Sequence, residues 1–342
     1  MEKKDIVIDY LQSLISEEKI KVGDKLESEN VLSKKLGVSR VVVREALSIL
    51  TKNGTIEKRH GWGSLVVNTD LYRKRKYIII DAYYRYLFDD FSNSYKYTCN
   101  ILNKLVEEKN YTPFFYVENP DTDLLSSIKI SKNDIAGVIS VLGSDETLSK
   151  IVENNIPVVR TLNHSENASV FPSVSFNFKD FYYKLFSIIG DNKNVVFFNF
   201  LRPNYFPNFE FFFELGLKKY LEEEYTLFNI EFDGKSSSIE KKVKKGLSSL
   251  KKSPDILVLT DDNIYRFAKS HIDSFIKNNP KTKLLTMSTS CDINLEGDNI
   301  CELRFDLDKN AEETVNLLLK LINKEPLFVS QSFINPEIIN NF

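Results

Sequence analysis

Two arginines one helical turn apart, Arg40 and Arg44, have a spacing that suggests a specific chemistry. They lie in the stretch 37–47, GVSRVVVREAL. Arginine binds a guanine edge with two hydrogen bonds, and the methyl groups of a valine such as Val41 can contact a thymine methyl group. A helix that carries these side chains on one face suits a DNA major groove. Taken alone, such a stretch is more often an ordinary amphipathic surface helix, so the neighbouring residues have to decide.

The opposite face of this helix is predicted to be buried, because apolar residues recur there at helical spacing. Gly37 can end a preceding helix in the left-handed conformation, and Ser39 is a good N-cap for the next one. The pair Asn53-Gly54 predicts the end of the helix. The apolar stripe consists of Val42, Val43, Ala46, Leu47 and Leu50.

The flanking sequence predicts two more helices and a hairpin. Apolar residues between Ile6 and Ile15 indicate a first helix, and Ser28 caps a short second one with Val31, Leu32 and Leu36 facing inward. Strands at 55–59 and 64–67, joined through 60–63, form the hairpin. Taken by themselves, Lys58, Arg59 and His60 are typical of a solvated turn. Beside a helix-turn-helix, they are expected to contact DNA phosphates. Trp62 is expected to pack the hairpin onto the helices. Residues 1–70 are therefore predicted to form a winged helix-turn-helix.

Charge and cysteine content agree with this division of the chain. Residues 1–76 carry a formal charge of +5 and the remaining residues carry −7, although the whole chain is only −2. A basic segment on an acidic body fits a segment that meets phosphate. Three widely spaced cysteines, Cys99, Cys291 and Cys301, indicate neither a zinc site nor a disulfide framework. Without a signal peptide or a membrane-spanning run, the expected location is the reducing cytoplasm.

The N-terminal segment resembles the GntR family of bacterial transcription regulators. The matching residues are Gly23, Leu26-Glu-Ser-Glu29, Leu32, Leu36-Gly-Val-Ser-Arg40, Val43-Arg-Glu-Ala-Leu47, Leu50, Gly54, Ile56, Gly61, Gly63 and Val66. The resemblance implies that the second helix of the motif enters the major groove and that His60-Gly61 reaches the minor groove. Glu27 stands where the family usually has proline, and Asn30 where it often has a DNA-contacting arginine. The predicted DNA-binding residues are Ser28, Asn30, Ser39, Arg40, Val41, Arg44, Lys58, Arg59, His60 and Gly61.

The chain beyond residue 76 alternates between buried strands and helices. Residues 71–76, LYRKRK, are a basic linker beside DNA or a charged edge before the first strand. Strand–helix alternation predicts parallel sheets with right-handed crossovers, and the number of strands predicts two lobes. Strands are expected at 77–81, 113–117, 135–141, 157–160, 194–200, 225–232, 256–259 and 283–287. Helices are expected around 93–108, 145–154, 178–189, 209–222, 236–250, 263–278 and 309–323.

This second part resembles the sugar-sensing body of LacI-type regulators, which has the type I periplasmic-binding-protein fold. The matching pieces are Asp134–Ser140, Ile156–Val159, Pro172–Ser175, Gly216, Pro254–Asp262, and Pro326–Val329 with Asn335–Ile339. A GntR-type segment before such a body also resembles arabinose-responsive repressors. The resemblance implies two lobes that close on a small ligand and three chain crossings between them. We place lobe 1 at 77–190 and 305–325, and lobe 2 at 191–304 and 326–342, with crossings near 188–193, 303–307 and 325–328.

Ligand-binding residues are expected at the carboxyl ends of the strands, where open α/β sheets bind ligands. Asp262 matches the family's sugar-binding aspartate, and of the pair Asp261–Asp262 we expect one to cap a helix and the other to face the cleft. Phe213 stands where the family often has a ligand-clamping arginine, inside an aromatic stretch whose rings are mostly core. One or two of these rings could stack on a ligand. The predicted ligand-binding residues are Tyr83, Tyr84, Arg85, Gly143, Ser144, Asn204, Phe206, Phe213 and Asp262.

These features predict a homodimeric transcription regulator that binds operator DNA and a small sugar-like effector. Of the two modes of regulation, repression is the one expected. No catalytic triad, metal-ligand spacing or nucleotide-binding loop is present in the sequence, so neither an enzyme nor a cofactor is expected. A second possibility keeps the DNA-binding segment and makes the body a dimerisation or protein-interaction module with a vestigial cleft. An enzymatic body is the third possibility and lacks a recognisable nucleophile.

Overall fold

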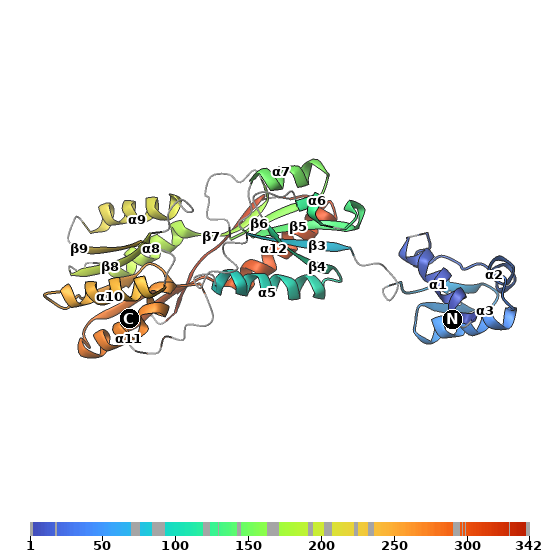
Figure 1. Cartoon of the computed structure of the whole chain (residues 1–342), viewed down its shortest axis with the longest axis horizontal. Helices are drawn as coiled ribbons and strands as arrows, with labels where there is room; N and C mark the ends of the chain where they lie inside the picture. The colour runs from blue at the N-terminus through green and yellow to red at the C-terminus, as the bar shows by residue number, and fades with distance from the viewer. Residues whose placement is uncertain are drawn as a thin grey trace. The chain divides into compact units, whose positions relative to one another are not determined.

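The computed structural model of the chain describes residues 3–17, 19–69, 76–83, 93–118, 124–128, 130–141, 145–162, 171–190, 194–201, 207–221, 225–231, 236–289, 295, 297, 299–327 and 329–339. The chain divides into two compact units, Met1–Arg75 and Lys76–Phe342. We call the first the head and the second the body. Figure 1 labels their helices and several of their strands.

The head contains the three helices and the hairpin that the sequence predicts. Its elements are α1 (Lys3–Ser16), α2 (Glu29–Leu36), α3 (Arg40–Lys52), β1 (Ile56–Arg59) and β2 (Gly63–Val66). The apolar stripe of α3 packs against α1 and α2, where Val43 and Leu50 are fully buried. Val31 was expected in this core, but it is 46% exposed because α2 turns its Leu32 side inward.

The hairpin, called the wing below, is attached to the rest of the head by backbone hydrogen bonds. Strands β1 and β2 are antiparallel, with Arg59 opposite Gly63. On its other edge β2 pairs with the segment before α2. The Leu26 amide donates to the Ser64 carbonyl at 2.8 Å, and the Val66 amide donates to the Asp24 carbonyl at 2.9 Å. Strand β2 is therefore hydrogen-bonded along both of its edges, which fixes the wing to the rest of the head.

The first sheet of the body is six-stranded and parallel. Its order is β13-β7-β6-β5-β3-β4. Helices α5 (Asn93–Glu108) and α12 (Leu307–Ile322) pack against each other on one face, and α7 (Asp145–Glu153) contacts β6. A single turn, α6 (Leu124–Ser127), and the 3-10 helix η1 (Lys132–Asp134) complete this lobe. The strands are β3 (Tyr77–Tyr83), β4 (Thr112–Glu118), β5 (Ile135–Val141), β6 (Val158–Thr161), β7 (Ser173–Phe176) and β13 (Gln331–Ile334).

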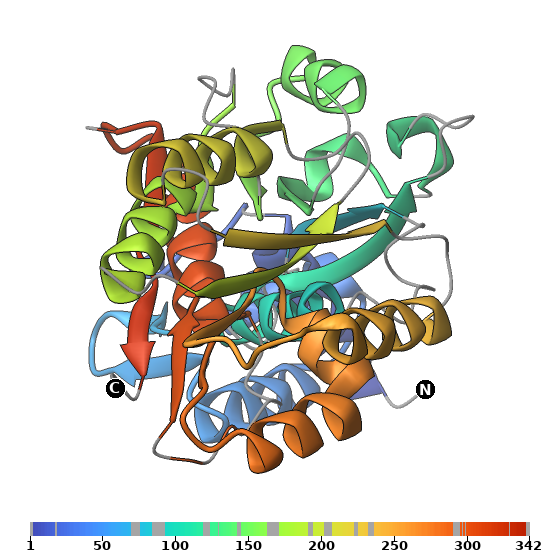
Figure 2. The same ribbon diagram turned by 90° about the vertical axis from the view of Figure 1, so that its left-hand side faces the viewer.

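The second sheet is also six-stranded, in the order β14-β12-β11-β10-β8-β9. Its pairs are parallel except β12 with β14. Helices α8 (Phe178–Ile189) and α9 (Pro207–Tyr220) lie side by side (Figure 2), and α10 (Ser236–Ser249) packs on α11 (Asp262–Asn278). The strands are β8 (Val195–Leu201), β9 (Tyr225–Glu231), β10 (Ile256–Leu259), β11 (Lys283–Ser288), β12 (Ile300–Arg304) and β14 (Glu337–Ile339). The predicted two-sheet α/β body is confirmed.

Two of the three predicted chain crossings are wrong. Helix α8 packs on α9 of the second lobe, so the first crossing precedes α8, at Phe176–Phe178, instead of following it at 188–193. The last crossing lies between β13 and β14, because β13 pairs with β7 of the first sheet. The middle crossing lies where it was predicted, between β12 and α12. There Phe305 stacks on Phe176, with ring centroids 4.5 Å apart, so two of the crossing segments are in contact.

None of the helices that the structure describes combines the length and the apolar character of a membrane-spanning segment.

Candidate DNA-binding face and ligand site

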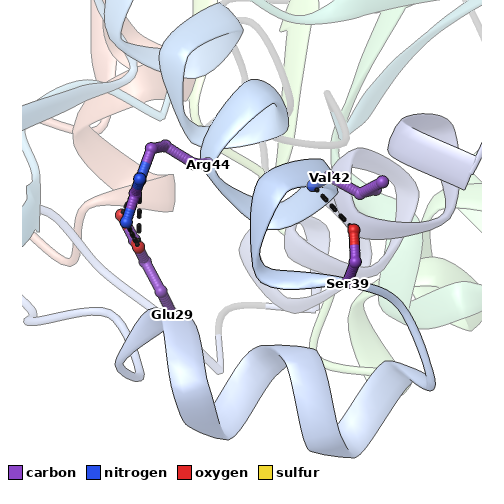
Figure 3. A network of polar contacts seen from close by, with 4 residues as sticks. All are labelled: Glu29, Ser39, Val42 and Arg44. Carbon is purple, nitrogen blue, oxygen red and sulfur yellow. Dashed lines mark hydrogen bonds and ion pairs between the residues drawn. The ribbon is translucent and has the colours of Figure 1, made fainter.

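Helix α3 presents its predicted DNA-reading residues to solvent. The Ser39 side chain accepts a hydrogen bond from the Val42 amide at 3.4 Å, which confirms the predicted N-cap (Figure 3). Gly37 ends α2 with φ 65°, in the left-handed region where a side chain would be strained. The chain therefore turns sharply between α2 and α3. Arg40, Val41 and Arg44 are exposed, and Val41 is 73% exposed.

Helix α2 begins on the same part of the head. Ser28 is its N-cap and accepts from the Val31 amide, also at 3.4 Å. Asn30 is exposed in the first turn. Glu27, in the place of the family's proline, is bound by Lys35 Nζ at 3.1 Å. Contact of Ser28 and Asn30 with DNA remains a prediction.

A carboxylate that the sequence did not single out holds Arg44. Nε of Arg44 donates to Glu29 Oε2 at 3.2 Å, and Nη2 donates to the same oxygen at 2.9 Å (Figure 3). The hydrogen bond from Arg44 is the main cause that lowers the pKa of Glu29, and Glu29 raises the pKa of Arg44. The contact uses the edge of the guanidinium that Nε and Nη2 form. Since arginine has five N–H donors, those of Nη1 are left to bind a base or a phosphate.

The wing carries exposed basic residues. Lys58, Arg59 and His60 are all exposed, and Arg59 Nη2 lies 3.3 Å from Glu57 Oε2. The charges of Lys58 and Arg40 both contribute to the lowered pKa of Glu29. Lys58 on β1 therefore lies close enough to the first turn of α2 for its charge to act on Glu29.

The prediction for Trp62 is wrong. Instead of packing the wing onto the helices, its side chain is 67% exposed. Gly61 and Gly63 on either side have positive φ angles of 76° and 94°. The loop thus projects Trp62 away from the helical core.

Most of the predicted ligand-binding residues lie outside the described part of the chain. These are Tyr84, Arg85, Gly143, Ser144, Asn204 and Phe206. Tyr83 is the last residue of β3, and its side chain also lies outside the description.

Phe213 is a core residue, which corrects its assignment to the ligand site. It lies on α9, is 2% exposed, and packs against α8 and β8. Its ring centroid lies 5.4 Å from that of Phe197 and 5.8 Å from that of Tyr182. Gly216, one turn later, allows this packing, because a Cβ there would lie 1.8 Å from the Phe186 ring.

One of the two aspartates Asp261 and Asp262 caps a helix, as predicted. Asp261 is the N-cap of α11, and its side chain accepts from the Asn263 amide at 2.9 Å. Asp262 is 7% exposed and accepts from Thr289 Oγ1 at 2.9 Å. That Asp262 binds a ligand remains a prediction.

Thr289 also connects the two lobes. Its Oγ1 lies 2.6 Å from Oγ of Ser94, at the start of α5 in the first lobe. Because a carboxylate only accepts, Thr289 donates to Asp262 and Ser94 donates to Thr289. We call this chain of hydrogen bonds the lobe bridge. No local pattern predicts it, since Ser94 and Thr289 are 195 residues apart.

Further polar side chains are buried at the carboxyl ends of the strands. In the second lobe Thr260 Oγ1 donates to Asn199 Oδ1 at 2.9 Å. In the first lobe Ser140 donates to Asp81, which is fully buried, at 3.3 Å. Arg160, on the neighbouring strand β6, is bound to Asp145 at 2.5 Å. Both sheets thus place hydrogen-bonding groups at the edge where parallel sheets bind ligands.

One amide group near the middle crossing is incompletely bonded. Thr161, the last residue of β6, donates to Asn310 Oδ1 at 2.6 Å, and Thr314 donates to Thr161 at 3.0 Å. Asn310 is fully buried in the first turn of α12, and its Nδ2 has no hydrogen-bond partner among the residues that the structure describes. A buried donor without a partner is costly and suits a ligand or water that accepts a hydrogen bond from it.

Comparison with known proteins supports the two-part description. Residues 3–66 match the model of the gntR family of bacterial regulatory proteins. The L-lactate dehydrogenase operon regulatory protein of Escherichia coli (strain K12) is 40% identical over 62 residues. The Uxu operon regulator of Haemophilus influenzae is 42% identical over 59 residues. The aligned residues are 18% and 17% of this chain, and 24% and 22% of those proteins. The chain thus spans about a quarter of the length of the curated relatives it matches. Its head is a GntR-type helix-turn-helix domain, as the sequence indicated.

The body has the fold of LacI-family regulators. A LacI family transcriptional regulator from Arthrobacter sp. FB24, in complex with lactose, superposes with a TM-score of 0.59 and 10% identity. The Cra transcriptional dual regulator of Pseudomonas putida, in complex with fructose 1-phosphate, gives 0.58 and 12%. Each match covers 78% of this chain, with 97% and 98% of the respective structure. At this identity the likeness concerns the fold.

Proposed function

We propose that the chain is a homodimeric, sequence-specific DNA-binding transcription regulator whose affinity for its operator is controlled by a small metabolite. The observation that carries this proposal is the outer surface of α3, where Arg40, Val41 and Arg44 are exposed on a helix fixed by a capped turn. Each head reads one half of an operator with two-fold symmetry, as dimeric helix-turn-helix proteins do. Such a regulator acts in the cytoplasm, where the DNA is.

The DNA-binding part is tested by enriching duplexes from a random-sequence pool with the full-length protein. Arg40→Ala and Arg44→Ala should each cost about 1–3 kcal/mol of binding to the enriched duplex if the residue contacts a base. Lys104→Ala is the matched control, because it removes an exposed cation of α5 in the body. If both arginine variants bind as tightly as the control, α3 is not the reading helix.

The effector is proposed to be a sugar or sugar derivative bound between the lobes, and the regulator to be a repressor. Buried hydroxyl, amide and carboxylate groups at the strand ends support this, because such groups match the hydroxyls of a sugar. The lobe bridge supports it too. The Thr289 hydroxyl is hydrogen-bonded to both Ser94 and Asp262, so a hydroxyl group of a ligand could take its place between them. Lactose and fructose 1-phosphate in two solved proteins of the same fold make sugars the first class to screen.

A thermal-shift screen against sugars, sugar phosphates and related metabolites tests this part. A ligand at a hundred times its dissociation constant stabilises the protein by roughly 2.7 kcal/mol. The effector should also weaken operator binding, and DNA should then weaken effector binding by the same factor. A stabilising ligand that leaves operator affinity unchanged would separate binding from regulation.

Two observations favour a second candidate for the body. Phe213 fills the core where an arginine would clamp a ligand, and the lobes already contact each other through Ser94 and Thr289. A body that only dimerises or binds another protein is consistent with both facts. Absence of any stabilising metabolite, with operator binding intact, would favour this module over the sensor.

A further inference from the structure

Trp62 leaves a large aromatic surface in water. It is the only tryptophan of the chain, and 67% of it is exposed. Elsewhere the large aromatic side chains form much of the core; Phe181, Phe186 and Phe197 are almost completely buried. Covering an exposed indole ring is favourable in proportion to its apolar area. An indole ring at this position is therefore suited to a contact with another molecule.

The loop that carries Trp62 is well defined. Arg59 and Gly63 pair across the hairpin, and the Trp62 amide donates to the Arg59 carbonyl at 3.0 Å. Gly61 and Gly63 adopt positive φ angles that other residues rarely take. Strand β2, which follows, is bonded on both edges. The ring is thus mounted on a support that is already ordered before any partner binds.

The surroundings of Trp62 are basic and lie near the proposed reading helix. His60 in the loop and Lys58 on β1 are exposed. The charge of Lys58 reaches Glu29, the residue that holds Arg44. A partner that binds α3 through its phosphates would therefore also be attracted to the wing.

We propose that Trp62 is a DNA contact, with its indole ring packed on the deoxyribose sugars at the edge of the minor groove beside the half-site that α3 reads. This inference rests on the proposed function of the head. Sugars are the apolar part of the DNA backbone, and contacts to them give affinity with little sequence information. The indole N–H can in addition donate to the N3 and O2 acceptors that A·T pairs show in the minor groove.

The single tryptophan makes the contact directly measurable. The full-length protein is titrated with a fluorescently labelled duplex enriched from a random-sequence pool, and DNA binding is followed by the anisotropy of the label. Tryptophan emission and its quenching by acrylamide are followed in the same titration. We expect the emission to change with the same midpoint as the anisotropy, and acrylamide to lose access to Trp62 when DNA is bound.

Substitutions test whether the contact contributes to affinity. Trp62→Ala should weaken binding to the enriched duplex by about tenfold, the scale of a buried tryptophan at an interface. Trp62→Phe, which keeps an aromatic ring, should recover most of that loss. Tyr183→Ala is the matched control, because Tyr183 is 62% exposed on α8 of the body. All three variants should unfold at the same temperature as the wild type.

Three outcomes would overturn the proposal. If the anisotropy reports binding while acrylamide still reaches Trp62, the head binds DNA without this residue and the proposed function stands. If Trp62 is already protected in the free protein, another copy of the chain covers it. If no duplex is enriched or bound, the DNA-binding function itself fails, and the contact fails with it.

Discussion

The head and the body place their polar groups in opposite environments. On the head, the side chains proposed to contact DNA project into water from an apolar core, and Val41 is 73% exposed. In the body, polar side chains at the strand ends are withdrawn from water. Asp81 and Asn310 are fully buried, and Asn199 is 4% exposed.

This difference separates two kinds of recognition. Exposed cations attract DNA phosphates over a distance and release counterions, so binding by the head should weaken steeply as salt rises. Buried hydrogen-bonding groups act only on a partner that enters and satisfies them, because each unpaired group costs free energy. Binding by the body should therefore depend on the shape and hydroxyl pattern of the ligand.

The cores of the two regions differ as well, which gives the largest expected effect. One apolar cluster holds the head together, while the described part of the body contains three. Leu50→Ala, at a fully buried position of α3, should lower the free energy of unfolding of the head by about 2–5 kcal/mol. Scanning calorimetry should show a low-temperature transition that moves down while the body's transition stays. A single transition that moves as a whole would show that the two regions unfold together.

Gly216→Ala should produce the converse result in the body. The added Cβ would lie 1.8 Å from the ring of Phe186, which is 1% exposed and cannot turn aside. Overpacking of this kind costs about 1–3 kcal/mol. The calorimetric transition of the body should move down while operator binding by the head persists. Leu215→Ala, at an exposed neighbouring position, is the control and should leave both unchanged.

These two sites show what local sequence rules can predict. The Ser39 cap and the stripe of α3 follow from spacing within one helix, so the head was predicted nearly residue by residue. The contact of Glu29 with Arg44 joins residues on two helices, and no local spacing encodes it. Trp62 was predicted to pack the hairpin onto the helices. The two positive-φ glycines that flank it direct it outward instead.

In the body, most strands were predicted, but β7 and β12 were not among the expected strands, and the partners of the last strands were not predicted either. Alternating apolar runs locate β3 to β6 and β8 to β11, since each run is buried within its own sheet. The pairing of β13 with β7 joins strands that are far apart in the sequence, so no local pattern predicts it. It places the last crossing between the lobes after residue 334. Predicted ligand residues followed strand ends, yet the lobe bridge uses Ser94 at a helix start.

The lobe bridge should contribute measurably to the stability of the body. Thr289→Val keeps the shape of the side chain but removes both hydrogen bonds, to Ser94 and to Asp262. We expect the free energy of unfolding of the body to fall by about 1 kcal/mol, the usual scale of a hydrogen bond. Urea denaturation measures it, with Thr226→Val on an exposed position of β9 as the control. Equal losses in both variants would deny the bridge any specific role.

The smallest expected effect concerns Glu29, the carboxylate that accepts hydrogen bonds from Arg44. Hydrogen bonding by Arg44 lowers the pKa of Glu29 below its ordinary value of 4.5. A lowered folded-state pKa stabilises the head above that ordinary value, and the contribution is lost as the pH falls through the lowered pKa. Unfolding of the head by urea should therefore become easier on acidification below pH 4.5, and less so in Glu29→Gln.

Because Arg44 is 60% exposed, solvent screens the pair and the difference should be small. The matched control is Glu57→Gln, which removes the wing carboxylate bound to Arg59 and leaves the partner of Arg44 in place. If Glu29→Gln responds to acid as the wild type does, the pair adds nothing to the folded head. Its remaining role would then be to orient Arg44 for DNA, where the same variant should lower the preference for the enriched duplex over a random one.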